Sequence, residues 1–367
     1  MIIDLTFIHQ RPLALAVVWS VVSSVTLLIL TGVFQVAGTE VDWRLFYKLW
    51  IPPVIVSCVL VFFFFPETYF LRPAVAFDGR ILLQGATEKI HLYDDWESAA
   101  VEKGLPDIPY PTWRIKLKEL QLWDTADCSW KAMRHCYLQV LLCFINPHIL
   151  WVVLLNSLVL GGMLSIGMTY AMVLTHDPYN MPVRRAALVN LSGAAGAFLA
   201  WPASGLLTSK IIYRLAMRNG GVRDAEFYLP AFILPVLASA TGLIIYGVTV
   251  QYQLPLSLVF VTYCLNTFSF VSLATVTNIW VTEAFPRHAA AALVVVTAGT
   301  YLATFSASFF IHAWVASQGV ARMNVELALM VLGVGCIGFP VAFWGKRVRQ
   351  SVEGRWAAHE GGALRPQ

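Results

Sequence analysis

The polar side chains on the apolar runs of this sequence are mostly hydroxyls and amides, which can hold a solute by hydrogen bonds. The clearest set falls at i, i+4, i+7, i+11 and i+15 of one run: Thr297, Tyr301, Thr304, Ser308 and His312. This spacing places the five on one face of a helix. Such a stripe faces either a solute cavity, which we favour, or a neighbouring helix, and both interpretations stay open. For His312, an interfacial histidine is preferred over a proton relay.

Three other apolar runs supply further candidates for the lining of the same cavity. Asn266 lies near the middle of its run and is the strongest single candidate. The remaining candidates are Asn156, Tyr170, Asn190, Trp201 and Ser269. The small residues of Ser192–Ala197, SGAAGA, predict close helix packing rather than a binding site.

Charged side chains avoid the middle of every apolar run. Only Glu283 and Glu326, among the acids, touch an apolar run, and both lie at its ends. Proton-coupled transporters place a titratable group at depth in the membrane, so the sequence shows no coupling chemistry. It also shows no nucleophile–base set, no metal-ligand spacing and no phosphate-binding loop. We therefore expect no catalytic residues, no metal and no cofactor, and we expect that the protein is not an enzyme.

The composition indicates that membrane-spanning helices hold these polar residues in place. Of 367 residues, 58% are hydrophobic and 13% are charged, whereas a soluble domain carries about 25% charged residues. A membrane-spanning helix needs roughly 20 apolar residues, and eight windows qualify. The fold class is therefore all-α, a polytopic membrane helix bundle of about eight transmembrane helices. The windows are 13–37, 48–66, 146–173, 187–212, 229–250, 255–282, 289–314 and 325–345.

The distribution of basic residues predicts the orientation of the bundle. Lys and Arg concentrate in loops on the cytoplasmic side of a membrane. Most of the 25 Lys and Arg fall in segments on the same side of the membrane as the N-terminus. The exceptions, on the opposite side, are Arg44, Lys48, Arg184, Arg185 and Arg322. Both termini are therefore expected in the cytoplasm. The expected partners are the lipid bilayer and a small-molecule solute, and nothing indicates nucleic-acid binding.

The stretch 67–145 is the one long loop. Its first half is rich in Gly, Pro and Asp and is expected to be irregular. TWRIKLKELQLWD, residues 112–124, has apolar residues at helical spacing with lysines between them. It predicts either an amphipathic helix on the membrane surface or a linker helix that covers the bundle.

Four stretches at the cytoplasmic helix ends combine acids with bases. They are DLTFIHQR (4–11), FPETYFLRP (65–73), RNGGVRDAEFYLP (218–230) and TEAFPRHAAAA (282–292). Paired charges at helix ends can latch helices together. The predicted gating residues are Asp4, Arg11, Glu67, Glu283 and Arg287.

Together these stretches resemble the major facilitator superfamily, in its fungal drug:proton antiporter-like branch. That family has D-x-x-F-x-x-x-R-G between helices four and five, FPET after helix six, and E-x-F-P-x-x-x-R between helices ten and eleven. The order and spacing agree, although Pro12 stands in place of the glycine. The resemblance implies an N-terminally truncated chain with helices 5–12 of 12. The implied parts are 1–72, the last two helices of an N-terminal half; 73–145, a cytoplasmic central loop with an amphipathic helix; 146–346, a six-helix C-terminal half; and 347–367, a cytoplasmic tail.

The resemblance also implies a function. The expected protein is a multi-pass transporter of a small organic solute, a drug-like compound or a polyamine, in the plasma membrane. Proton coupling is expected in a full-length form only. The alternative is a truncated, non-transporting remnant or a regulatory membrane protein, which associates with itself or with a full-length relative.

Overall fold

A computed structural model describes most of the apolar segments of the chain. The described residues are 10–37, 43–64, 75–77, 80–84, 90–93, 130–219, 224–285 and 288–356. Two units are distinguished, one of residues 1–49 and 135–361 and the other of residues 50–134 and 362–367.

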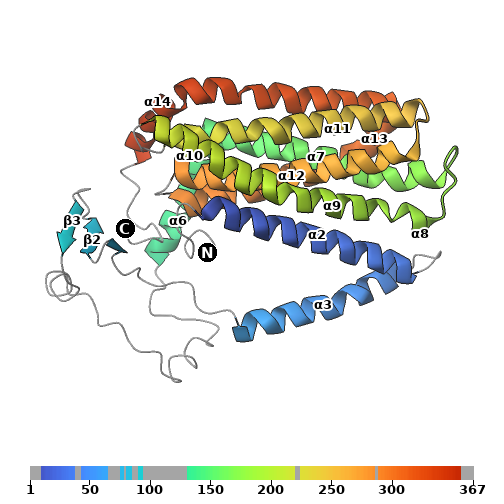
Figure 1. Ribbon diagram of the computed structural model, residues 1–367, viewed down its shortest axis with the longest axis horizontal. Coiled ribbons are helices and arrows are strands. Elements are labelled where there is room, and N and C mark those ends of the chain that lie inside the picture. The colour runs from blue at the N-terminus through green and yellow to red at the C-terminus, as the bar shows by residue number, and fades with distance from the viewer. Residues whose placement is uncertain are drawn as a thin grey trace. The chain divides into compact units, whose positions relative to one another are not determined.

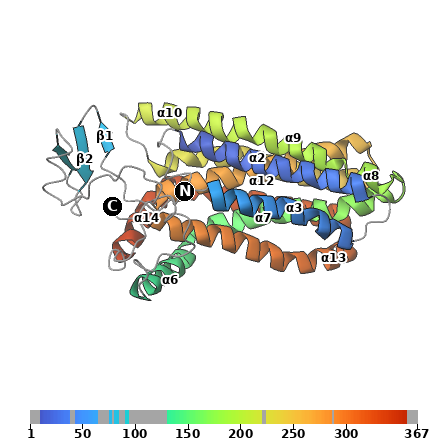
Figure 2. The ribbon, with the colours of Figure 1, turned by 90° about the horizontal axis from the view of Figure 1, so that it is seen from below.

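The first unit is a helix bundle, in which α2, α7, α9, α11, α12 and α13 run side by side (Figures 1 and 2). Its elements are α2 (Arg11–Ala37), α6 (Trp130–Ile145), α7 (Pro147–Thr175), α8 (Val183–Ala186), α9 (Val189–Trp201), a π-helical turn η1 (Pro202–Leu207), α10 (Thr208–Arg218), a 3-10 helix η2 (Ala225–Phe232), α11 (Ile233–Gln251), α12 (Leu256–Ala284), α13 (Ala289–Cys336) and α14 (Gly338–Trp356). Of these, α6 begins in the second unit.

The lengths of these helices confirm the prediction of about eight membrane crossings. Six stretches of the described residues are long and apolar enough to cross a membrane. The last, Ala289–Arg347, has 59 residues, about 88 Å of helix, which is enough for two crossings. α3 (Trp43–Phe64) adds the shorter apolar stretch Tyr47–Phe63.

Gly319 makes the turn between the two crossings of α13. Its φ of 80° and ψ of 162° are not helical, and positive φ is a conformation that glycine adopts without steric penalty. Before this residue Thr304 contacts Ser157 of α7, and after it Asn324 and Val334 contact Ser165 and Trp151 of the same helix, so the second segment runs back along α7. One helix label therefore covers two antiparallel segments.

Pro202, inside the fourth apolar window, begins a change of helix type. Proline has no N–H to donate and its ring clashes with the carbonyl four residues earlier. The chain responds with the π-helical turn η1 and then continues as α10. The fourth crossing is therefore continuous, with a local widening on its second half.

α12 lies at the centre of the bundle, and its buried face is unusually rich in hydroxyl and amide side chains. It packs closely on α9, as the small residues of Ser192–Ala197 predict. A Cβ at Gly196 would lie 2.2 Å from the carbonyl oxygen of Cys264, so this approach of two backbones requires glycine. The apolar core extends from α12 to α7, α9, α11 and α13.

The second unit holds a small antiparallel sheet of β1 (Val75–Phe77), β2 (Arg80–Gln84) and β3 (Ile90–Tyr93), in the order β1-β2-β3. Ala76 pairs with Ile81, and Leu82 with Leu92. The prediction of an irregular first half of the loop is wrong for these residues. The predicted helix at 112–124 lies outside the described residues.

Candidate functional site

Arg11 and Glu283 form an ion pair at one end of the bundle, here named the Arg11 end. Arg11 Nη1 lies 3.0 Å from Glu283 Oε1, and the side chains are 16% and 24% exposed. The pair joins the start of α2 to the last turn of α12. Next to it, a Cβ at Gly205 of η1 would lie 3.1 Å from the Cβ of Ala16. The pair is mostly shielded from water, so salt screens it less than a surface pair.

Two further hydrogen bonds attach α2 to the fourth crossing. The Ser24 hydroxyl donates to the carbonyl of Ala194 at 3.0 Å. The Gln35 amide donates to the carbonyl of Arg184 at 2.8 Å, at the opposite end of the bundle, here named the Gln35 end. α2 is thus attached at three levels, by an ion pair at one end and by neutral bonds at the middle and the other end.

A buried network of three side chains joins α7, α9 and α12 near the Gln35 end. The Tyr263 hydroxyl donates to Asn190 Oδ1 at 3.1 Å, and Asn190 Nδ2 donates to the Tyr170 hydroxyl at 3.3 Å. Nδ2 also donates to the carbonyl of Ala187 at 3.1 Å. The two tyrosine rings meet edge to face at 5.7 Å. All three side chains are at most 8% exposed.

A second set of buried polar contacts ties α7 to its neighbours. Asn156 Nδ2 donates to the Thr277 hydroxyl at 2.9 Å, toward the Arg11 end. The Thr169 and Tyr246 hydroxyls lie 2.8 Å apart and join α7 to α11. Thr277 and Tyr263 lie among the many polar residues of the sixth window, 255–282, and spacing does not single them out. Tyr246 lies in the fifth window, where no pattern marked it.

The structure turns Asn266 and Ser269 toward α11. Asn266 Nδ2 donates to the carbonyl of Thr262 at 3.0 Å, and a Cβ at Gly242 would lie 2.4 Å from that nitrogen. Ser269 donates to the carbonyl of Pro235 at 2.6 Å. Both side chains therefore occupy the interface of two helices.

The remaining candidates are scattered. The Thr304 hydroxyl is buried and donates to the carbonyl of Ser157 on α7 at 3.3 Å, whereas Tyr301 is 50% exposed. Ser308 donates to its own helix at Phe305. Trp201 is half-buried and stacks edge to face on Phe198. Of the predicted gating residues, three lie outside the described residues: Asp4, Glu67 and Arg287.

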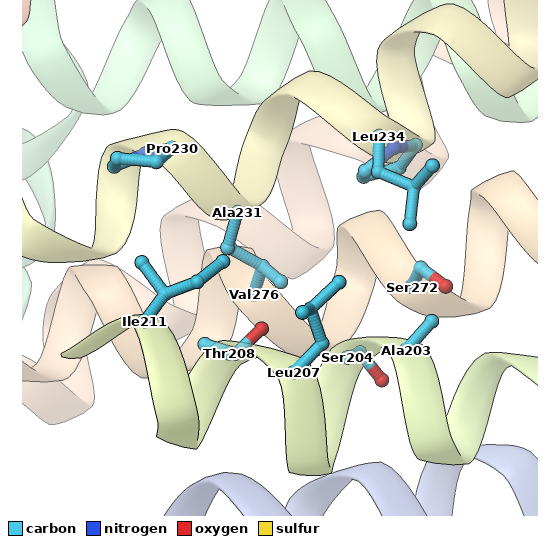
Figure 3. Close-up of a pocket in the computed structure, with 11 residues that line it drawn as sticks. Ala203, Ser204, Leu207, Thr208, Ile211, Pro230, Ala231, Leu234, Ser272 and Val276 are labelled. Carbon is cyan, nitrogen blue, oxygen red and sulfur yellow. The ribbon is translucent and has the colours of Figure 1, made fainter. Parts of the chain in front are cut away.

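A cavity of about 30 Å³ lies between η1 and α10 on one side and η2, α11 and α12 on the other (Figure 3). Its lining is mostly apolar, with the buried hydroxyl-bearing residues Ser204, Thr208 and Ser272. The volume is that of about one water molecule, so this cavity is too small for an organic solute. Among the described residues, no group of three or more His, Cys, Asp or Glu side chains could hold a metal ion.

Comparison with known proteins identifies the family to which the chain belongs. The family model of the Major Facilitator Superfamily matches residues 1–308. Protein HOL1 of Saccharomyces cerevisiae is 21% identical over 172 residues, 47% of this chain and 29% of that protein. An uncharacterized MFS-type transporter of Schizosaccharomyces pombe, C1271.10c, is 22% identical over 183 residues, 50% of this chain and 31% of that protein. The chain thus aligns with about three tenths of each relative's length. No solved structure gives a significant match.

Proposed function

Since the chain belongs to the major facilitator superfamily, a family of membrane transporters, we propose that it moves a small organic solute across the plasma membrane. The proposed solute class is a drug-like organic cation or a polyamine. The observation that carries the proposal is the network of Tyr170, Asn190 and Tyr263, which gathers two aromatic rings and an amide from three different helices.

The chemistry of this network suits a cation. Tyrosine rings attract ammonium groups through their π faces, and amide and hydroxyl oxygens accept hydrogen bonds from them. Neither Lys nor Arg lies on α7 or on α12, two of the three helices that supply the network. A cation that reached this network would therefore meet acceptors without a repelling charge from those helices.

The Arg11–Glu283 pair supplies the second element of the proposal, a latch. With both termini in the cytoplasm, the Arg11 end is the cytoplasmic end, and the ion pair holds it closed. The tyrosine network then lies toward the opposite face. A transporter that exposes its site alternately to two sides needs a closure that can break at each end, and these two groups of contacts are the candidates.

The proposal for this chain does not include proton coupling. The described spans carry no Asp or Glu in their central turns, and a buried titratable group is what coupling requires. Uptake by this chain is therefore expected to follow the solute gradient and the membrane potential, without accumulation driven by a pH gradient.

Uptake by purified protein in proteoliposomes tests the proposal, with radiolabelled spermidine and tetraphenylphosphonium as probes. We expect uptake of at least one probe. Tyr263→Phe removes one hydrogen bond, about 0.5–1.5 kcal/mol, and should lower the initial rate up to about tenfold. Tyr252→Phe makes the same chemical change at a tyrosine that is 70% exposed and should leave the rate unchanged.

The outcomes distinguish a transporter from a non-transporting protein. Folded protein that takes up neither probe overturns the transport proposal and favours a non-transporting protein that regulates or pairs with a relative. Equal rates for Tyr263→Phe and wild type remove the network from the proposed site while leaving transport intact.

A further inference from the structure

The helix α6, which precedes α7, carries an exposed apolar stripe along one of its faces. Gln139 and Cys143 are 6% and 0% exposed and mark the packed face. The opposite face is spaced by three, four, four and three residues, which is a single side of a helix. Its members and their exposures are Trp130 82%, Met133 44%, Tyr137 62%, Leu141 59% and Phe144 56%.

The place of α6 in the chain excludes it from the hydrocarbon core. α7 alone has 29 residues, about 43 Å of helix, which already exceeds the roughly 30 Å core of a bilayer. Sixteen more helical residues in front of it must therefore lie beyond the core, at the Arg11 end. A long exposed apolar stripe at that level meets either lipid headgroups or water.

Asn146 and Pro147 separate the two helices. Proline disfavours helical backbone at the residue before it, and Asn146 accordingly has an extended ψ of 121°. The Asn146 side chain accepts a hydrogen bond from the backbone N–H of His148 at 3.0 Å, which caps α7. Figure 2 shows α6 lying at an angle to α7. The chain therefore turns between α6 and α7 instead of continuing straight.

The composition of the exposed face fits a lipid surface. Trp and Tyr concentrate at the membrane–water interface because one part of the ring system is apolar and another is polar. Arg134 is exposed on the same helix, where it can meet an anionic headgroup. Exposed apolar side chains continue along the chain from Phe144 to Leu150 and Leu154 of the spanning helix α7.

We propose that α6 lies in the headgroup region of the bilayer leaflet at the Arg11 end, with its stripe inserted and with anionic phospholipid beside Arg134. By the expected orientation this is the cytoplasmic leaflet. α6 then anchors the start of α7, the helix that carries Asn156 and Tyr170, to the membrane surface. The proposal concerns a lipid contact and does not depend on which solute the protein binds.

Spin labels on the full chain test the depth of α6. The protein would be placed in nanodiscs of phosphatidylcholine with a minority of phosphatidylserine. Single cysteines at Met133, Tyr137, Leu141 and Phe144, in a background without exposed native cysteines, would be labelled one at a time. Collision with O₂ is then compared with collision with a water-soluble nickel complex. We expect all four labels to favour O₂ at one shallow depth, and the control Leu154→Cys to lie deeper.

Four results would overturn the proposal. Preference for the nickel complex means that the stripe faces water. Protection from both reagents means that another part of the chain covers it. Broadening between labels means that a second copy covers it. A steady increase of depth from Met133→Cys to Phe144→Cys means that α6 continues the crossing of α7.

A charge-bearing variant isolates the stripe from the fold. Tyr137→Asp with Leu141→Asp should shift the label at Met133→Cys from O₂ toward the nickel complex by severalfold, while thermal unfolding stays near that of the parent. Arg134→Gln should abolish the difference in depth between nanodiscs with and without phosphatidylserine. An unchanged label environment in both variants contradicts the proposal.

Discussion

Breaking the Arg11–Glu283 ion pair should loosen the Arg11 end of α2. Arg11→Gln removes the guanidinium that lies 3.0 Å from the Glu283 carboxylate. The Glu283 carboxylate is then left 24% exposed without this charge partner, and opening of the end would hydrate it fully. The substitution therefore stabilises the open arrangement relative to the closed one.

The size of the effect follows from the geometry of the pair. A hydrogen bond to a charged group contributes about 1.5–3 kcal/mol, well above the median for surface pairs. Because some water still reaches the pair, we expect the lower end of that range. A change of about 1.4 kcal/mol is tenfold in an equilibrium constant, so the open population should rise about tenfold.

Ser20 provides a reporter for that population. It is 1% exposed on α2, between Arg11 and Ser24, and its hydroxyl has no hydrogen-bond partner among the described residues. Ser20→Cys is nearly isosteric, so it should not disturb the closed arrangement. The rate at which a water-soluble maleimide modifies this thiol, in nanodiscs and at fixed pH, then follows the open fraction. Arg11→Gln should raise that rate about tenfold.

A matched substitution supplies the control. Arg322 forms an i, i+4 pair with Glu326, and its side chain is 72% exposed, a type of pair that contributes about 0.3–0.5 kcal/mol. Arg322→Gln should therefore leave the rate at Ser20→Cys unchanged. The charge swap Arg11→Glu with Glu283→Arg should restore slow labelling. If Arg11→Gln labels no faster than Arg322→Gln, the pair does not hold α2 closed.

Three further predictions concern stability and reactivity. Gly319→Ala places a Cβ at φ 80° and ψ 162°, a region that is essentially open to glycine alone, and should lower the free energy of unfolding by about 1–3 kcal/mol. An unchanged melting temperature in detergent would mean that the turn does not require glycine. Trp280→Ala removes a ring whose centroid lies 5.8–6.4 Å from those of three aromatic neighbours and should cost about 3–5 kcal/mol, whereas Trp344→Ala at a 60% exposed site should cost far less. Burial raises the pKa of the Cys143 thiol to about 12, so at pH 8 this thiol should stay protonated and unmodified by maleimide, while the partly exposed Cys136 of the same helix reacts. Mass spectrometry of the native protein checks this, and modification of both thiols at equal rates refutes the packing of α6.

The crossings could be predicted from sequence because each depends on one property, about 20 consecutive apolar residues. The fourth window tolerated Pro202 because a membrane helix can rearrange locally, and η1 is that rearrangement. The loop was harder. Short strands such as Arg80–Gln84 are stabilised by pairing with the strands just before and after them, and Gly and Pro nearby outweighed their weak local pattern. The helix α6 was missed because its apolar side chains gather on one face, while Arg134 and His135 break the continuous apolar run that marks a crossing.

The candidate site shows what spacing cannot specify. Periodicity tells which residues share a helix face, but it does not tell which neighbour that face meets. Asn190 and Tyr170 were both named, and the structure joins them through hydrogen bonds that also require Tyr263. Asn266 was the strongest candidate by its depth, yet it lies against Gly242 on α11. The choice of neighbour depends on how α12 is rotated in the bundle, which is a property of all its contacts together.

Because α2 is held by an ion pair at one end and by a neutral hydrogen bond at the other, the two ends should respond differently to salt. The Debye length falls from about 10 Å at 0.1 M to about 3 Å at 1 M salt. Salt therefore weakens the Arg11–Glu283 pair but not the neutral bond from Gln35 to the carbonyl of Arg184. Because the pair is mostly buried, we expect only a two- to threefold faster labelling of Ser20→Cys at about 1 M salt. Val33→Cys, at a 9% exposed position near Gln35, should label at an unchanged rate. Equal acceleration at both positions would mean that α2 separates from the bundle as one rigid piece, and the Arg11 end would then not be an independent latch.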